Sequence, residues 1–289
     1  MKKGSTINDG GENVRRKRSI TILYEIILVM VTFIMALPLF LAITISFQKP
    51  EAVFSYPPKF FPTSFYWKNY VEAFKYVPLA RLFLNSLIVA SLITLGKLAT
   101  GALAGFAFSH FNFKGKKVMF AALFATLFLP AETVMILPLF LIMKTFGWVN
   151  TYWALTIPFM ASATNTFLMR QHFLTIPREL QDAALIDGAS YMQFFWKVLI
   201  PLSKHMLAGA SIINFVYAWN MYLWPLIVSM EDKMKTVQVG VKMLMQAESA
   251  NNWGVIMAGT VVALAPTVVM FLALQNLFVK SLVRSGMKG

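Results

Sequence analysis

Long hydrophobic runs separated by shorter polar segments dominate the chain. Six of these runs have roughly the 20 mainly apolar residues that a transmembrane helix needs. They span residues 20–46, 82–108, 118–142, 152–171, 206–228 and 254–279. Strand-like alternation is absent from them, and a backbone within lipid must satisfy its own hydrogen bonds. The pattern therefore predicts an all-α membrane protein with six transmembrane helices.

The polar segments divide the chain into a tail and a transmembrane domain. Residues 1–19 are polar and basic, which predicts a flexible cytoplasmic tail. The hydrophobic run that follows is too long for a signal peptide, and no small-residue cleavage site follows it. We therefore expect one transmembrane domain over residues 20–289.

Composition and charge set the orientation of this domain. The chain is 58% hydrophobic and 13% charged, whereas soluble domains average about 25% charged residues. Its formal net charge of +14 would suggest a nucleic-acid partner in a soluble protein. Here, sixteen of the 26 Lys and Arg residues fall in the tail, the 109–117 loop, the 170–205 segment and the C-terminus. This bias predicts that both termini are cytoplasmic and explains the basic run 14–18 without any nucleic acid.

The residue types and their spacing give no indication of a metal site or of thiol chemistry. The chain has no cysteine, which excludes disulfides, thiol catalysis and thiolate metal sites. Its three histidines, His110, His172 and His205, do not have the spacing of metal ligands. We therefore expect no metal or cofactor bound by this chain.

Three charged residues fall within the predicted spans. A central charge costs at least ~2.5–3.5 kcal/mol on insertion scales, so each requires an explanation. Glu25 is near the cytoplasmic end and can extend to the interface. Lys97 and Glu132 lie deeper, in the second and third spans. Either they pair across the two helices or one of them faces a translocation path.

The stretch "YAWNMYLWPL", residues 217–226, lies near the outer end of the fifth span. An interfacial belt of aromatic residues explains most of it. Asn220 and Tyr222 are nevertheless candidates to hydrogen-bond a polar solute that passes along this helix.

One polar module, residues 177–204, interrupts the hydrophobic pattern between the fourth and fifth runs. It opens with "IPRELQDAALIDG", in which Pro177 suits a first helical turn and Gly188 suits a helix end. "SYMQFFWKVLIPL" follows, with apolar residues at helical spacing up to Pro201. The pattern predicts two short cytoplasmic helices joined at Asp187–Gly188. A connector resting on the membrane explains the aromatic residues, but the small charged first helix is typical of one that docks into a groove.

The module closely resembles the E-A-A-x-x-x-G signature of the inner-membrane permease subunits of bacterial ABC importers. The fuller pattern, E-A-A-x-x-D-G-A followed by an aromatic residue and L-P, is matched in register. The matching residues are Asp182, Ala183, Ala184, Asp187, Gly188, Ala189, Phe195, Leu199 or Ile200, and Pro201. The chain departs from it at Asp182, where the family has Glu, and at His205, where Pro is frequent. Stretches 91–97, 155–177 and 217–226 resemble the maltose-type carbohydrate permeases, and most of all their glycerol-3-phosphate branch.

The resemblance implies a permease subunit, and not an enzyme, of a binding-protein-dependent importer in the bacterial cytoplasmic membrane. It implies a heterodimer with a homologous permease, two ATPase subunits that bind ATP and Mg²⁺, and an external solute-binding protein. A coupling helix at about 177–190, between the fourth and fifth spans, would enter the ATPase. The residues that would make this contact are Asp182, Ala183, Ala184, Asp187, Gly188 and Ala189. The solute would be small and polar, with sn-glycerol 3-phosphate or a di- or oligosaccharide as leading candidates.

Two other classes of function stay open from the residues alone. An ion-coupled secondary transporter would rely on Glu132 and Lys97, although the sequence shows no inverted repeat. A membrane scaffold without transport would bind partners but show no solute-dependent ATP hydrolysis. The chain has no G-x-x-x-x-G-K-[ST] phosphate-binding loop, so ATP would have to be bound by a separate subunit.

Overall fold

The computed structural model describes residues 9–57, 60–62, 64–128, 134–246 and 252–286. Within these ranges every regular element is helical, which confirms the predicted all-α class.

The three longest helices are α1 (Asp9–Ser46), α4 (Leu79–His110) and α16 (Trp253–Gly286). Each contains a stretch that is long and apolar enough to cross a membrane, which confirms helices at the first, second and sixth predicted spans. The apolar part of α1, Thr21–Ser46, agrees with the predicted span of residues 20–46, although the helix itself begins earlier. Residues 9–19 continue the helix, because extending an existing helix adds a hydrogen bond for each further residue. Residues 1–8 of the predicted tail lie outside the described ranges.

The third predicted span, 118–142, contains residues outside the described ranges. On either side of them lie α5 (Lys116–Ala125) with the 3₁₀ turn η1 (Thr126–Phe128), and α7 (Ile136–Thr145).

The fourth predicted span is not one continuous helix, which corrects the prediction for residues 152–171. It consists of α8 (Tyr152–Thr156), η2 (Ile157–Phe159) and α9 (Ala163–Phe173). Pro158 within η2 cannot donate a backbone hydrogen bond. The hydroxyl of Ser162 accepts a hydrogen bond from the Asn165 backbone N–H at 3.3 Å and so caps a new helix.

The fifth predicted span, residues 206–228, is also divided. It contains α13 (Lys204–Trp219) and α14 (Leu223–Val228). Before α13 the chain forms α11 (Tyr191–Phe194), the π-helical η3 (Phe195–Leu199) and α12 (Ile200–Leu202). The segment Tyr191–Leu202 meets α13 at an angle of 77°, so helical structure continues across a sharp bend.

Helix α4 is central to the molecule and packs against α9 and α13. Glycines allow α9 to approach closely: an added Cβ would lie 2.8 Å from the Asn165 side chain at Gly101, and 2.7 Å from Met169 at Gly105. Such small residues at helix contacts are typical of membrane proteins. On the other side of α13, the indole N–H of Trp219 donates to the Ala263 carbonyl of α16 at 2.8 Å.

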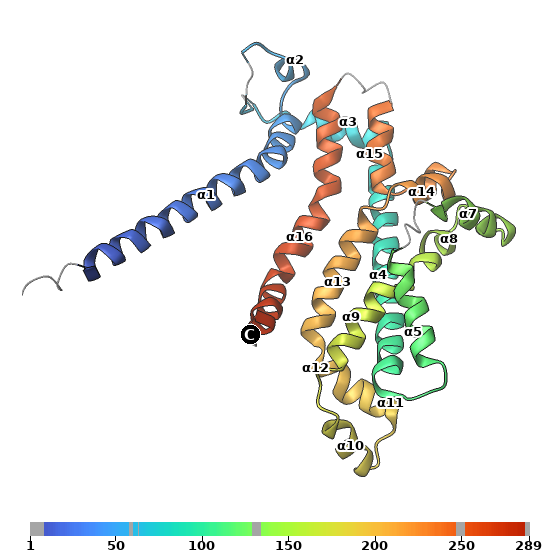
Figure 1. Ribbon diagram of the computed structural model, residues 1–289. Coiled ribbons are helices and arrows are strands. Elements are labelled where there is room, and N and C mark those ends of the chain that lie inside the picture. Colours follow the sequence, from blue (N-terminus) through green and yellow to red (C-terminus); the bar gives the residue numbers. More distant parts are fainter. Residues whose placement is uncertain (1–8, 58–59, 63, 129–133, 247–251, 287–289) are drawn as a thin grey trace, which may run out of the picture.

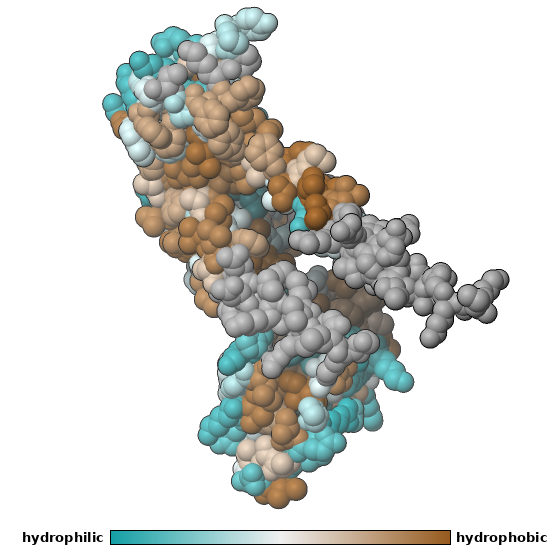
Figure 2. All heavy atoms as spheres, turned by 90° about the vertical axis from the view of Figure 1, so that its left-hand side faces the viewer, coloured by the Kyte–Doolittle hydropathy of each residue, from teal (hydrophilic) through white to brown (hydrophobic). Residues whose placement is uncertain are grey.

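The remaining elements gather at opposite ends of the bundle (Figure 1). The α15 end comprises α2 (Pro50–Val53), α3 (Lys68–Tyr76), η4 (Asp232–Met234) and α15 (Val237–Gln246). The α10 end comprises α10 (Glu179–Ile186) and α11. Figure 1 also shows α1 diverging from the bundle. Hydrophilic residues gather toward both ends of the face in Figure 2, and hydrophobic ones predominate between them.

Candidate functional site

The predicted docking module forms the tip of the α10 end (Figure 1). Of its predicted contact residues, Asp182, Ala183, Asp187 and Gly188 are exposed, whereas Ala184 and Ala189 are half-buried. Ile186, a large apolar residue, is 86% exposed at the end of α10. The tip of the module therefore presents both carboxylates and a large apolar side chain to its surroundings.

Local interactions specify the turn after α10. Gly188 has φ +81°, a left-handed conformation that other residues adopt only with strain. The N–H groups of Gly188 and Ala189 donate to the carbonyls of Leu185 (3.0 Å) and Ala184 (2.9 Å). These two bonds are the pair that closes a helix in a Schellman motif.

The helix that follows is capped just as tightly. The Ser190 hydroxyl accepts from the Gln193 backbone N–H at 3.2 Å, and the Gln193 side chain accepts from the Ser190 N–H at 2.8 Å. This reciprocal capping box starts α11 directly after the turn. The structure thus contains two short helices joined at Asp187–Gly188, as the sequence predicts.

An aromatic cluster attaches the module to the bundle. Phe194 and Phe195 are each 1% exposed and lie against Phe106 of α4, with ring centroids 6.4 and 5.1 Å away. Phe173 of α9 belongs to the same buried cluster, and Ala184 packs against it. One face of α10 is therefore held by the bundle, and the other is left to solvent or a partner.

Lys97, a predicted path residue, is buried in α4 with 8% of its surface exposed. Its ammonium lies 3.7 Å from the centroid of the Tyr217 ring on α13. A cation over an aromatic face is stabilised by the ring quadrupole, which provides part of the compensation that a buried charge requires. Glu132 lies outside the described residues, so its pairing with Lys97 stays a prediction.

Asn220 and Tyr222 lie at the break between α13 and α14. The Asn220 amide donates to the Val216 carbonyl at 2.8 Å and accepts from the Gln238 side chain of α15 at 3.2 Å. Tyr217, one helical turn before Asn220, lies against Lys97.

The sequence reasoning overlooked Asn214, Tyr217 and Gln238. Asn214 is 7% exposed, and its Nδ2 has no described hydrogen-bond partner. Residues 214, 217 and 220 recur at a three-residue spacing in "NFVYAWN", which would place them on one helix face. That spacing was the signal available in the sequence. We call Lys97, Asn214, Tyr217, Asn220 and Gln238 the polar strip.

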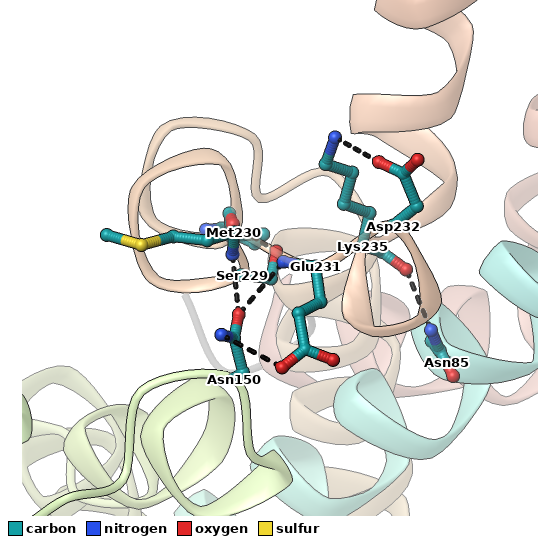
Figure 3. Close-up of polar contacts among 8 residues, drawn as sticks. Asn85, Asn150, Ser229, Met230, Glu231, Asp232 and Lys235 are labelled. Carbon is teal, nitrogen blue, oxygen red and sulfur yellow. Dashed lines mark hydrogen bonds and ion pairs between the residues drawn. The ribbon is translucent and has the colours of Figure 1, made fainter.

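Toward the α15 end, side-chain amides hold the loop after α14 in place (Figure 3). Asn150, with φ 62°, accepts from the backbone N–H groups of Met230 (2.6 Å) and Glu231 (3.0 Å) through its Oδ1. Its backbone N–H donates to the Val228 carbonyl at 3.1 Å. The turn between α7 and α8 and the loop before α15 are thereby joined.

Asn85 of α4 makes the second connection to this loop. Its Nδ2 donates to the carbonyls of Lys233 (2.9 Å) and Lys235 (2.8 Å), and its Oδ1 accepts from the Tyr152 hydroxyl at 2.7 Å. Because Asn85 is 3% exposed, these bonds satisfy a buried amide. Among the described residues, no group of three or more His, Asp or Glu could hold a metal ion.

Comparison with known proteins gives one family match. The family described as "Binding-protein-dependent transport system inner membrane component" matches residues 97–284, which include α4 from its middle, the α10 module and the polar strip.

Similarity to individual proteins covers most of the chain. The sn-glycerol-3-phosphate transport system permease protein UgpE of Yersinia pestis bv. Antiqua (strain Antiqua) is 35% identical over 279 residues, 94% of this chain and 99% of that protein. UgpE of Salmonella typhi is 38% identical over 280 residues, with the same coverage. The fold is similar to that in the crystal structure of a bacterial ABC transporter involved in the import of the acidic polysaccharide alginate. The TM-score is 0.80 with 22% identity, over 91% of this chain and 97% of the other.

Proposed function

Because the chain belongs to the family of binding-protein-dependent transport system inner membrane components, we propose that it is a permease subunit that imports sn-glycerol 3-phosphate. The relatives whose names carry this solute match almost the full length of the chain. Family membership leaves the ion-coupled and scaffold alternatives without support.

Six membrane spans follow if each interrupted segment crosses once. The three long helices supply three spans, and α5 with α7, α8 with α9, and α13 with α14 supply the other three. Both termini then lie on the cytoplasmic side, together with the α10 end, and the concentration of Lys and Arg favours this orientation.

The mechanism rests on the exposed face of α10 and on the backbone bonds that close its C-terminal end. A coupling element must move as a unit, and its outer face must be open to a partner. The turn bonds at Gly188 supply the first property, and exposed Asp182, Ala183 and Ile186 supply the second. We assign this face to a groove in one of two ATPase subunits, which hydrolyse ATP outside this chain.

Movement of α10 would reach the solute path through α4 and α13. The aromatic cluster joins the module to α4, and the 77° bend joins it to α13. The polar strip lies on these two helices and α15, and we assign the interface with a homologous permease to this part of the bundle. A solute with a phosphate group requires a cation along its path, and Lys97 is suited to this role.

Uptake by the complete importer tests this function. The chain would be reconstituted in vesicles with its partner permease, ATPases and binding protein, and uptake of labelled sn-glycerol 3-phosphate would be measured with a tenfold excess of maltose as competitor. ATP-dependent uptake unaffected by maltose is expected. Uptake that maltose abolishes would contradict the proposed solute, and uptake that persists without ATP but stops with an uncoupler would contradict the proposed mechanism.

A further inference from the structure

We propose that Lys116, Lys117, Arg170 and Arg178 form a binding site for the phosphodiester headgroup of an anionic phospholipid. We call these four residues the basic cluster. They come from α5, α9 and the start of α10, on the proposed cytoplasmic side. The site uses none of the residues assigned above to the solute or to the ATPase.

Two cations of the cluster are held against the last turn of α4. The Arg170 Nε donates to the Phe108 carbonyl at 3.2 Å, and the guanidinium lies 4.3 Å from the centroid of the Phe120 ring. The Lys116 ammonium donates to the Phe111 carbonyl at 2.7 Å. Each contact uses one N–H of a group that has three or five, so both cations keep donors for an anion.

The cluster is not neutralised within the described part of the chain. The described ion pairs join Lys68 to Glu72, Glu231 to Lys233 and Asp232 to Lys235, all at the α15 end. The pKa of the Lys116 ammonium is lowered from its usual value, first by burial and then by the positive charges of Arg170 and Arg178. Lys116, Arg170 and Arg178 are therefore close enough to repel one another, and an anion that binds beside Lys116 reduces that repulsion.

The surroundings indicate a lipid and not a small soluble anion. Lys116 and Lys117 line an open hollow of about 410 Å³ together with Asn112, Phe113, Gly115 and Val118. On the membrane side of this hollow, Val118 is 73% exposed and the adjacent Met119 is 56% exposed. A headgroup anion in the hollow would place its acyl chains along these apolar side chains, where a free phosphate would leave them uncovered.

The test compares two double variants that remove the same charge from the same side of the membrane. Lys116→Gln/Lys117→Gln changes the cluster, whereas Lys197→Gln/Lys204→Gln changes two exposed lysines of the α11–α13 segment. The assembled transporter would be purified in micelles with equal phosphatidylglycerol and phosphatidylcholine, and retained lipids would be counted by native mass spectrometry. The cluster variant should lose preference for phosphatidylglycerol by about 30-fold, and the control variant should lose less than threefold.

Three results would overturn the proposal. The first is an equal loss of preference for phosphatidylglycerol in both double variants. The second is retention of phosphatidylcholine and phosphatidylglycerol in equal amounts by the unaltered transporter. The third is displacement of phosphatidylglycerol by an equal concentration of inorganic phosphate. If the cluster variant does not fold, Lys117→Gln alone tests the site, because Lys117 is exposed. Its loss of preference should be severalfold, and no loss would equally overturn the proposal. Arg170→Lys, which keeps the charge, should retain most of the preference.

Discussion

The α15 end and the α10 end of this molecule differ in whether charged side chains form ion pairs within the chain. At the α15 end, ion pairs join Glu231 to Lys233 at 2.5 Å and Asp232 to Lys235 at 2.6 Å, and the Asn85 and Asn150 amides hold the adjoining loop. Near the α10 end, no described ion pair involves the carboxylates of Glu179, Asp182 and Asp187 or the basic cluster. The charges of the loop before α15 are paired within the chain, whereas no described ion pair neutralises the charges around α10, which stay available to other molecules.

This difference explains how one end of a permease can stay fixed while a helix at the other end moves with a partner. A loop held by side-chain amides changes position only if those hydrogen bonds break. A helix closed by its own backbone bonds can move as a body, because its partners move with it. Substitutions at the two ends test this difference.

The largest effect is expected at Gly188. Gly188→Asp should abolish uptake and solute-stimulated ATP hydrolysis, because a carboxylate enters the proposed ATPase contact beside Asp187. Gly147→Asp is the matched control: both glycines have positive φ, +81° and +69°, and an added Cβ meets nothing within 4 Å at either. Any strain from Asp in this left-handed conformation is common to both variants, so the two should insert into the membrane equally well. Normal stimulation of ATP hydrolysis in Gly188→Asp would contradict the coupling role of α10.

The second prediction separates the two faces of α10. Ala184→Glu should abolish uptake and also destabilise the protein by about 1–3 kcal/mol, because Ala184 packs against the aromatic cluster. Ala183→Glu should abolish stimulated ATP hydrolysis with little change in stability, because Ala183 is exposed. Thermal unfolding in detergent and ATP hydrolysis in vesicles measure the two effects. Equal loss of stability in both variants would show that α10 has no free face.

The third prediction concerns the α15 end. Asn85→Ala removes three hydrogen bonds from a buried position and should lower the free energy of unfolding by about 1–3 kcal/mol. Tyr152→Phe removes only one of them and should cost about 0.5–1.5 kcal/mol. Chemical unfolding of the detergent-purified protein measures both. An Asn85→Ala protein as stable as the unaltered one would mean that the amide does not hold the loop.

The smallest effect is expected at an ion pair of the same end. The Lys68 ammonium lies 3.6 Å from the Glu72 carboxylate, but the Lys68 side chain is 64% exposed. Lys68→Ala should therefore change stability by only about 0.2–1 kcal/mol, and less at high salt. The same unfolding measurement at low and high salt checks this, with Asn85→Ala as the reference for a buried contact. A loss that matches Asn85→Ala would show that ion pairs, and not amides, hold this end.

The local features of the α10 module could be predicted because neighbouring residues produce them. The turn closes α10 because Gly188 and Ala189 donate to carbonyls three and five positions earlier, respectively. Ser190 caps α11 by accepting from the Gln193 N–H. Pro158 and Pro225 made breaks in the fourth and fifth spans possible, but the sequence did not show where each new helix begins. Hydropathy alone does not show that Ser162 caps a new helix or that Asn220 ends one.

The all-α membrane class, the three long helices and the turn at Asp187–Gly188 could be predicted, because hydrophobic runs and helix caps are features of continuous sequence. The relative positions of the charges instead depend on how distant helices pack. Asn85 donates a hydrogen bond to Lys233, 148 residues away in the sequence, and Arg170 donates one to Phe108, 62 residues away. The Lys97 ammonium lies over the ring of Tyr217. Such contacts depend on how helices pack, and no local pattern in the sequence encodes which distant residues that packing brings together.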